Sequence, residues 1–340
     1  MHPFGILVSR AYLRPPNLNF KIFKAMPLKA TCFFLLLTGF LTAQTDRFSV
    51  TPEGKGPNRC WLVRHAGAEA VAPTRVVVFL HGFGATNPGC YGGWIEHLLG
   101  DPATGAGHLV IYPKFQTGLW PPRGEAYTKR IQRRLETILE DLQEQFPGMP
   151  TDVTLIGHSI GGVIAANLAD RQADFEHFSV NGILLTTPGH KVFPCGRQSN
   201  YERIPPELPV VIVTGEEDGA SGDKFALYFT ERSPQLTRRI HLSQQPDRTS
   251  DERVRARHRT PVSPLPELYQ SNFNLITIGA RLVCRTDLAD RNCYFRLSDA
   301  LLSCAEGTDC VTLNPTAPTV TNMGKFSNGT PVAPLLVVRE

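Results

Sequence analysis

The sequence predicts an α/β protein built on a mostly parallel central sheet with helices on both faces. From residue 75 onward, short apolar runs alternate with longer amphipathic ones, which is typical of strand–helix–strand units. The apolar runs are rich in β-branched residues and bounded by Gly, Pro or Asp, as expected of strands buried on both sides. The chain has 340 residues, 41% of them hydrophobic, and so can bury one large core.

The first 43 residues are expected to be a leader that precedes the fold. They hold five of the 35 basic residues and none of the 31 acidic ones. The rest of the chain is therefore close to neutral and offers no electrostatic footprint for nucleic acid. Met26 is a second candidate start, followed by a basic stretch, an apolar run at 32–41 and small or polar residues at 42–44, the pattern of a signal peptide.

A membrane anchor is the alternative interpretation of this leader. A span needs roughly 20 apolar residues, and the run at 32–41 has about half that number. We therefore expect a protein that is secreted or periplasmic, with no stable membrane span in its mature form.

Hydrophobic periodicity predicts the elements that follow. Short apolar runs indicate strands at 75–80, 108–112, 153–156, 182–185, 209–214 and 239–242. Apolar residues at three- and four-residue spacing indicate helices at 126–146, 161–173 and 297–302. The polar stretch 247–266 is expected to be a surface loop. We interpret 47–340 as one domain, in which 266–340 is a C-terminal extension packed on the main part.

A GxSxG motif, Gly157 to Gly161, lies between the strand at 153–156 and the helix at 161–173. In this context the serine of the motif sits on a tight strand-to-helix turn. The two glycines relieve crowding in the turn, while Ser159 is held in a strained conformation with its Oγ above the sheet edge. We predict that Ser159 is a nucleophile and that the N–H of Ile160, at the helix start, stabilises the negative charge that develops beside it.

A second donor for that charge is expected in the loop after the strand at 75–80. The loop reads His81-Gly82-Phe83-Gly84, and its glycines allow the backbone to approach a substrate closely. The N–H of Phe83 is our candidate. The alternative, that this loop is merely a turn, stays open.

The chain resembles the α/β-hydrolase family over most of residues 75–260. The likeness is carried by HGFGATNPGCYGGWIEHL from His81, LVIYP from Leu109, LIGHSIGG from Leu155 and VVIVTGEEDG from Val210. A weaker likeness to the tail of some secreted bacterial members covers FRLSDALLSC from Phe295 and MGKFSNG from Met323. The resemblance implies the α/β-hydrolase fold and a catalytic triad in the chain order Ser, acid, His.

The same resemblance implies which acid and which histidine complete the triad. Asp218 follows the strand at 209–214, where the family's acid usually stands, with Glu216, Glu217 and Asp223 as rivals. His258 lies on the loop after the last core strand, where the family has its base.

The other histidines are less suited to act as the base. His241 is the main rival, but it falls inside the strand at 239–242. His158, next to the nucleophile, is expected to point away into helix packing. No motif surrounds the rest, which are His65, His97, His177 and His190.

These residues predict a serine hydrolase that cleaves carboxylic esters through an acyl-enzyme. The preference for esters is implied by the resemblance alone. A peptidase or an acyltransferase with the same triad is an alternative, and so is a non-catalytic binding protein, which should have a broken triad. The expected substrate is a small-molecule or lipid ester. No cofactor and no metal are expected, since neither CxxC nor HExxH occurs. The oligomeric state stays open.

Seven cysteines follow the leader, and disulfides are their expected state in an exported protein. Cys304 and Cys310 are the first expected pair, because only a short glycine-containing loop separates them. Cys284 and Cys293 are the second. The odd number leaves at least one thiol without a partner in the same chain.

We expect no large cap domain over the site. The segment 187–207, where such caps are usually inserted, is short and holds four prolines. An open site follows, unless 266–340 folds over the pocket.

A cluster of arginines surrounds His258 in the sequence. It either forms a solvated polar loop or favours substrates with an anionic group near the ester. Its members are Arg248, Arg253, Arg255, Arg257 and Arg259.

Overall fold

The computed structural model describes residues 47–116, 124–193, 195–270, 274–315 and 317–338. Asp46–Glu340 form one compact unit. The expected leader at 1–43 lies outside the described residues. Among the helices that are described, none is both long and apolar enough to cross a membrane.

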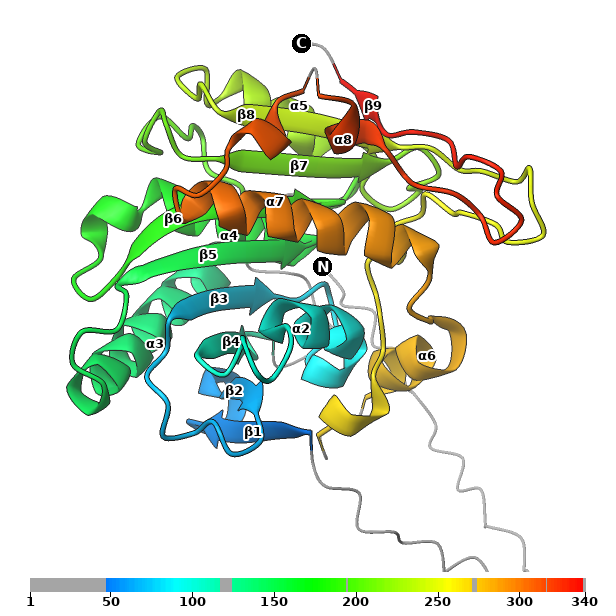
Figure 1. Cartoon of the computed structure of the whole chain (residues 1–340). Coiled ribbons are helices and arrows are strands. Elements are labelled where there is room, and N and C mark those ends of the chain that lie inside the picture. The colour runs from blue at the N-terminus through cyan, green and yellow to red at the C-terminus, as the bar shows by residue number, and fades with distance from the viewer. Residues whose placement is uncertain (1–46, 117–123, 194, 271–273, 316, 339–340) are drawn as a thin grey trace, which may run out of the picture. The chain divides into compact units, whose positions relative to one another are not determined.

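The described strands form a single sheet in the order β1-β2-β4-β3-β5-β6-β7-β8-β9 (Figure 1). Its centre is parallel and consists of β3 (Arg75–Leu80), β4 (His108–Pro113), β5 (Asp152–His158), β6 (Ser179–Thr186), β7 (Val210–Gly215) and β8 (Arg239–Gln244). Antiparallel strands extend both edges, and these are β1 (Phe48–Glu53), β2 (Cys60–His65) and β9 (Leu336–Val337). The parallel centre confirms the strands expected from the apolar runs; the edge strands were not expected.

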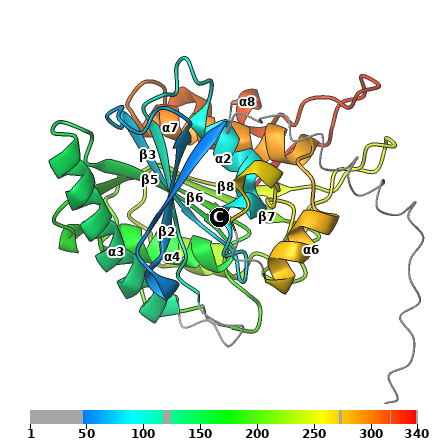
Figure 2. The same ribbon diagram turned by 90° about the horizontal axis from the view of Figure 1, so that it is seen from below.

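Helices cover both faces of this sheet (Figure 2). One face carries α3 (Gly124–Gln145), α4 (Ile160–Asp170) and α5 (Lys224–Glu231), and the other carries α2 (Gly92–Leu99) and α7 (Arg296–Ala305). Strand β3 serves both cores, because Val76 and Val78 are buried on the α3 side and Val77 and Phe79 on the α7 side. A strand alternates its side chains in this way, and so a doubly covered strand reads as one apolar run. The architecture is the expected α/β-hydrolase fold.

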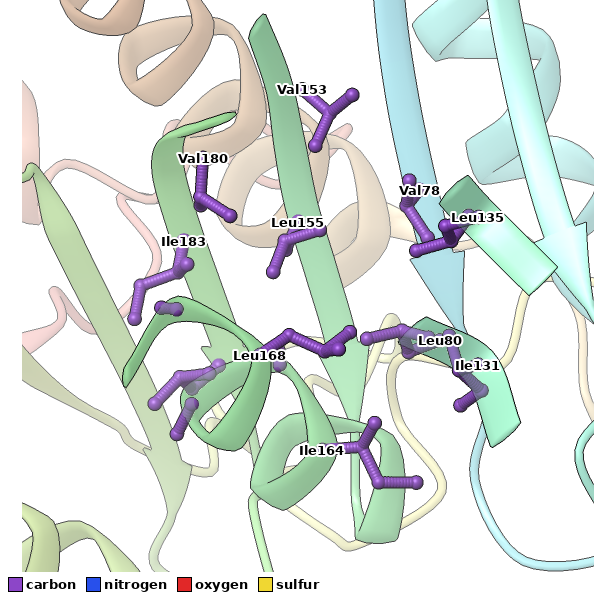
Figure 3. Packing of buried hydrophobic residues seen from close by; sticks show 14 of the residues in the cluster. Val78, Leu80, Ile131, Leu135, Val153, Leu155, Ile164, Leu168, Val180 and Ile183 are labelled. Atoms are coloured by element: carbon purple, nitrogen blue, oxygen red, sulfur yellow. The ribbon is translucent and has the colours of Figure 1, made fainter. Parts of the chain in front are cut away.

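The core on the α3 and α4 side holds the turn that carries Ser159. In Figure 3, Leu155 of β5 lies among side chains of neighbouring strands and helices, including Leu80, Ile164 and Leu168. All four are fully buried. Burial of each such side chain stabilises the fold by about 1.5–3 kcal/mol. This packing fixes α4 against the carboxyl end of β5.

The described part of the C-terminal segment 266–340 contributes side chains to the hydrophobic core and is not only an outer cover. Helix α7 buries Leu297 and Leu301 in the same cluster as Leu184 of β6. It follows α6 (Leu275–Val283) and a π-helical turn (Asp290–Phe295), and it precedes α8 (Pro318–Thr321). Without this segment, the sheet would lose the helix that covers the middle of one face.

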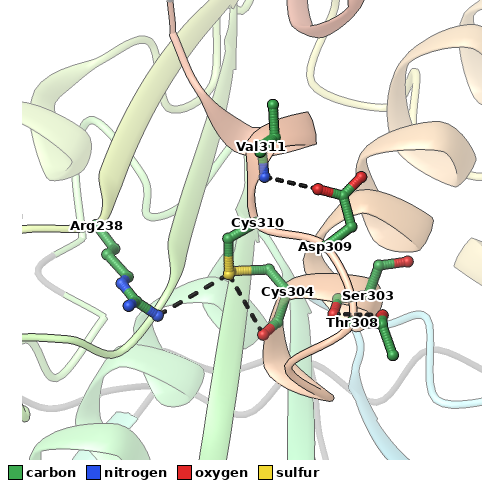
Figure 4. Close-up of a disulfide and its surroundings, with 7 residues drawn as sticks. All are labelled: Arg238, Ser303, Cys304, Thr308, Asp309, Cys310 and Val311. Atoms are coloured by element: carbon green, nitrogen blue, oxygen red, sulfur yellow. Dashed lines mark hydrogen bonds between the residues drawn. A yellow bond between two sulfur atoms is a disulfide. The ribbon is translucent and has the colours of Figure 1, made fainter.

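Cys304, in the last turn of α7, forms the expected disulfide with Cys310 (Figure 4). The second expected pair is wrong, since Cys284 and Cys293 are both free. Cys293 is fully buried in the core beneath the sheet's second face, whereas Cys284 lies at the C-terminal end of α6 and is partly exposed. The two thiols therefore belong to different environments.

Candidate active site

Ser159 occupies the turn between β5 and α4 with a φ of +57°. A residue with a Cβ adopts this left-handed backbone only at an energetic cost. A Cβ on Gly157 would lie 2.4 Å from the carbonyl oxygen of Gly161, and one on Gly161 would lie 2.0 Å from that of Leu80. Only glycine fits at either position. The tight, strained turn expected from the GxSxG motif is therefore present.

Ser159, His258 and Asp218 form a chain of hydrogen bonds at the carboxyl ends of the parallel strands. Ser159 Oγ lies 2.9 Å from His258 Nε2, and His258 Nδ1 lies 3.0 Å from Asp218 Oδ2. The three residues follow β5, β8 and β7 respectively, so three separate strand ends bring them together. Ser159 and Asp218 are buried. This arrangement can deprotonate a serine hydroxyl.

Asp218 is held in its ionised form. Its Oδ1 accepts hydrogen bonds from the N–H groups of Ala220, at 2.8 Å, and Ser221, at 2.9 Å. Burial by itself would raise the pKa of Asp218, but the hydrogen bond and charge of His258, together with these N–H groups, outweigh burial and hold the pKa below its ordinary value. The carboxylate accepts a hydrogen bond from His258 Nδ1 and so keeps the proton of the neutral imidazole on that nitrogen. His258 Nε2 is then free to accept a proton from Ser159.

The rival acids and the rival base lie elsewhere. Glu217 forms ion pairs with Arg248 and Arg257 on the surface. Glu216 is exposed, and Asp223 stands at the N-terminus of α5. His241 is buried in β8, where its Nε2 lies 3.1 Å from Thr214 Oγ1. None of these side chains contacts Ser159 in the described structure.

The expectation for His158 is wrong, because its ring packs against the catalytic loop and not among helices. Its Nε2 lies 2.7 Å from the carbonyl oxygen of His258, and its Nδ1 lies 2.6 Å from the hydroxyl of Tyr91. Burial, and then the charge of His258, lower the pKa of His158 to about 3. The neutral ring therefore donates from Nε2 to the His258 carbonyl and accepts the Tyr91 proton at Nδ1.

Tyr91 extends this chain of hydrogen bonds to the glycine-rich loop. Its hydroxyl accepts a hydrogen bond from the N–H of Gly82 at 3.0 Å. The loop that follows β3 is thus joined, through Tyr91 and His158, to the loop that carries His258. The sequence did not predict that Tyr91 and His158 join these two loops. It also missed Ser221, whose Oγ lies 3.1 Å from His258 Nδ1.

Hydrogen bonds to the Gly82 carbonyl oxygen fix the orientation of the Gly82–Phe83 peptide. The Gly82 oxygen accepts from His81 Nδ1 at 2.7 Å and from the N–H of Ala85 at 3.1 Å. Burial lowers the pKa of His81 to about 4, so its ring is neutral and Nδ1 acts as the donor. In a trans peptide the N–H points opposite to the C=O. The N–H of Phe83 therefore points away from His81, and Phe83 lines the same pocket as Ser159.

Ile160 presents the second N–H to the same pocket. It is the first residue of α4, and the first N–H groups of a helix lack intrahelical acceptors. Within the described residues, neither Ile160 N–H nor Phe83 N–H donates a hydrogen bond to the protein. Both predicted donors therefore belong to residues that line the pocket of Ser159, and both are available to an acceptor there.

The triad opens into a pocket of about 450 Å³. Its wall is mostly apolar and includes Phe83, Phe193, Val262, Ile276 and Ala280. The last two belong to α6, so the C-terminal segment covers one side of the site. As the short segment 187–207 predicts, no described residue between β6 and β7 is helical. No cluster of His, Cys, Asp and Glu that could hold a metal ion occurs in the part of the chain that the structure describes.

The family model of the alpha/beta hydrolase family matches residues 77–317, well over half of the chain. The chain therefore belongs to the alpha/beta hydrolase family. The comparison with curated proteins gives no match.

Solved structures of similar proteins include bacterial esterases. The chain is 15% identical to a thermostable esterase from Pseudomonas putida ECU1011, with coverage of 76% of this chain and 90% of that chain and a TM-score of 0.45. It is also 15% identical to a mutant of the esterase rPPE complexed with (S)-Ac-CPA, with coverages of 72% and 88% and a TM-score of 0.47. A CIB-like hydrolase from Thermoplasma acidophilum is 14% identical, with coverages of 58% and 87% and a TM-score of 0.36.

Proposed function

We propose that this protein is a serine hydrolase that cleaves carboxylic esters of small molecules or lipids through an acyl-enzyme on Ser159. The observation that carries the proposal is the unbroken hydrogen-bonded chain from Ser159 through His258 to Asp218. It opens into an apolar pocket large enough for the acyl part of a small ester. The N–H groups of Phe83 and Ile160, two residues that line this pocket, have no acceptor in the described part of the protein and so support the proposal.

In the proposed reaction, Ser159 Oγ forms a bond to the ester carbonyl carbon while its proton moves to His258 Nε2. The carbonyl oxygen becomes an oxyanion, which accepts hydrogen bonds from the N–H groups of Phe83 and Ile160. Collapse of this intermediate breaks the bond to the alcohol, which leaves with the proton from His258. Water then attacks the acyl-enzyme with His258 as base, and the carboxylic acid and free Ser159 are released. Asp218 stabilises the imidazolium in both halves.

Replacement of Ser159 by Ala tests this function. We expect ester hydrolysis to fall by a factor on the order of 10⁴ or more, because only binding and oxyanion contacts remain. The matched control is Ser199→Ala, which alters an exposed serine outside the pocket. Activity is measured on p-nitrophenyl esters from acetate to palmitate, and Ser159 is labelled with a fluorophosphonate probe. Substantial activity in Ser159→Ala, or no labelling of the wild type, would refute the proposal.

We also propose that the protein is exported, with 1–43 as the signal peptide. The pattern of the leader supports this, and so does the disulfide between Cys304 and Cys310, because such bonds persist in oxidising compartments. Fusion of residues 26–46 to an alkaline phosphatase that folds only after export should give phosphatase activity outside the cytoplasm. If the fusion gives no more phosphatase activity than the phosphatase without this segment, export is contradicted.

A further inference from the structure

The loop that delivers His258 places arginines on its outer side. In residues 253–257, Arg253, Arg255 and Arg257 are exposed, whereas Val254 and Ala256 between them are buried. This alternation is that of an extended segment. The buried residues anchor the loop against the end of β7, since a Cβ on Gly215 there would lie 2.4 Å from the Ala256 carbonyl oxygen. The arginines therefore stand on a fixed backbone beside the catalytic histidine.

These arginines line a hollow of about 270 Å³ that adjoins the active-site pocket. Arg259 and Val262 line both the hollow and the pocket of Ser159, so the two spaces share a wall. A fifth arginine, Arg285, reaches the same hollow from the segment after α6. The arginines around His258 were already apparent from the sequence, but the position of Arg285 beside them was not, because Arg285 is far along the chain from the His258 loop.

Positive charge dominates the hollow. Asp287 is the only acidic residue among the described residues that line it. Arg257 shares Glu217 with Arg248. Arg253, Arg255, Arg259 and Arg285 have no carboxylate within ion-pair distance in the described part of the chain. Like charges on one concave surface repel one another, and a bound anion relieves that repulsion.

We propose that this hollow is a subsite for an anionic group, such as a carboxylate, carried by the ester that Ser159 cleaves. Arginine forks recognise carboxylates and other oxyanions through paired N–H groups. The apolar pocket would hold the uncharged part of the substrate. Arg259, on the wall that the pocket and the hollow share, would contact the anionic group where the substrate extends from the pocket into the hollow. The inference rests on the proposed ester hydrolysis and names the substrate class of that same site.

The test compares anionic esters with neutral esters of matched length. One pair places the charge on the acyl side, with the mono-p-nitrophenyl ester of adipic acid set against p-nitrophenyl hexanoate. The other places it on the alcohol side, with the hexanoyl ester of p-hydroxybenzoate set against phenyl hexanoate. The readout is the ratio of kcat/KM for the anionic ester to that for its neutral match. In the wild type this ratio should fall as salt is raised from about 0.01 M to about 1 M, because the Debye length shrinks from about 30 Å to about 3 Å.

Arg285→Gln is the principal variant, because Arg285 lies outside the loop of the triad and cannot displace His258 directly. We expect it to lower the ratio about threefold to tenfold for at least one pair, as for loss of one partly exposed charge contact. Arg259→Gln should lower the ratio for the same pair. Arg248→Gln is the matched control, since Arg248 belongs to the same loop but pairs with Glu217 and does not line the hollow. It should leave the ratio within about twofold of the wild type.

A ratio that responds neither to salt nor to Arg285→Gln for both pairs would overturn the proposal while leaving ester hydrolysis intact. A loss of binding to anionic phospholipid vesicles in Arg285→Gln, with an unchanged ratio, would assign the arginines to a lipid surface and would also overturn it. If the wild type hydrolyses no ester and Ser159 is not labelled by the fluorophosphonate, the proposed function itself fails, and this subsite fails with it.

Discussion

His258 is positioned from three directions by residues of different segments. Its Nδ1 faces Asp218, its Nε2 faces Ser159, and its backbone carbonyl accepts from His158. The last contact fixes the backbone of the loop, so the imidazole does not depend on its side-chain partners alone. Because His158 is neutral and also bonded to Tyr91, the same chain reaches the loop of the proposed oxyanion donor.

Removal of the Tyr91 hydroxyl should weaken catalysis without abolishing it. In Tyr91→Phe, His158 Nδ1 and the N–H of Gly82 each lose a buried partner, at a cost of about 1–3 kcal/mol for each unpaired group. We expect kcat to fall about tenfold, with KM changed much less, because the two loops are displaced relative to Ser159 by a fraction of an ångström.

Tyr228→Phe is the matched control for this variant. Tyr228 belongs to α5 and does not line the pocket, and its hydroxyl donates a hydrogen bond to the Gln198 carbonyl oxygen. Steady-state kinetics and urea unfolding of both variants separate catalysis from stability. A Tyr91→Phe enzyme with unchanged kcat and an equal loss of stability in both variants would show that the chain through His158 is only structural.

The sequence predicted the residues that a motif marks and missed those that only the fold brings together. Ser159 could be found from its GxSxG turn, and Asp218 and His258 from the resemblance to the α/β-hydrolase family, which implies an acid and a histidine after particular strands. The contacts of His158 join it to residues 67 and 100 positions away, and no local pattern encodes such a pairing. Its aromatic, polar ring in a motif next to a helix fits helix packing equally well when the sequence is considered alone.

At the level of elements, the sequence predicted strands buried on both faces and missed those with weaker patterns. Strand β1 alternates only partly and contains Pro52, which an edge strand tolerates and a central strand does not. Helix α6 was missed because its apolar residues do not mark its buried face, which includes Thr277. Leu275 is 80% exposed and Leu282 74% exposed, while Ile276 lines the pocket. The one usable signal was Asn274, whose side chain caps the helix by accepting from the N–H of Thr277.

The disulfide at the end of α7 should stabilise the fold without affecting the reaction. It closes a short loop, with a sequence separation of 6, which in the chain-entropy account contributes about 2–3 kcal/mol. Arg238 contacts it and directly precedes β8, so the bond lies at the amino-terminal edge of the parallel strands, opposite to the triad. The double variant Cys304→Ser/Cys310→Ser should lose about that free energy of unfolding in urea and keep its kcat/KM.

Cys284→Ser is the control for this variant, since it removes a free, partly exposed thiol. It should change the free energy of unfolding by less than about 0.5 kcal/mol. Equal stability of the double variant and the wild type under oxidising conditions would contradict the contribution assigned to the bond.

For the molecule as a whole, the dependence of stability on pH should include a carboxyl group that is buried in one of the two cores. The core on the α7 side encloses Asp290, which is fully buried and has Oδ2 bonded to the N–H of Asp287, while Oδ1 has no partner among the described residues. Burial raises the pKa of Asp290 well above its usual range, and the nearby charge of Asp287 adds to this. An ionised carboxylate at this position therefore destabilises the folded protein.

Replacement of Asp290 by Asn should accordingly stabilise the protein most at alkaline pH. Because the pKa of Asp290 is raised in the folded state, the folded form takes up a proton before the unfolded form, whose carboxyl titrates near pH 3.9. The penalty is full above the folded-state pKa and declines as pH falls toward about 3.9, by up to about 1.4 kcal/mol per pH unit. We expect Asp290→Asn to exceed the wild type in free energy of unfolding by about 1 kcal/mol or more at pH 8, with the difference shrinking once the pH falls below the folded-state pKa of Asp290. Urea unfolding at several values between pH 8 and pH 5 measures it, with the exposed Asp251→Asn as the control for net charge. A difference that stays constant over this range would show that Asp290 is not the source of the pH dependence.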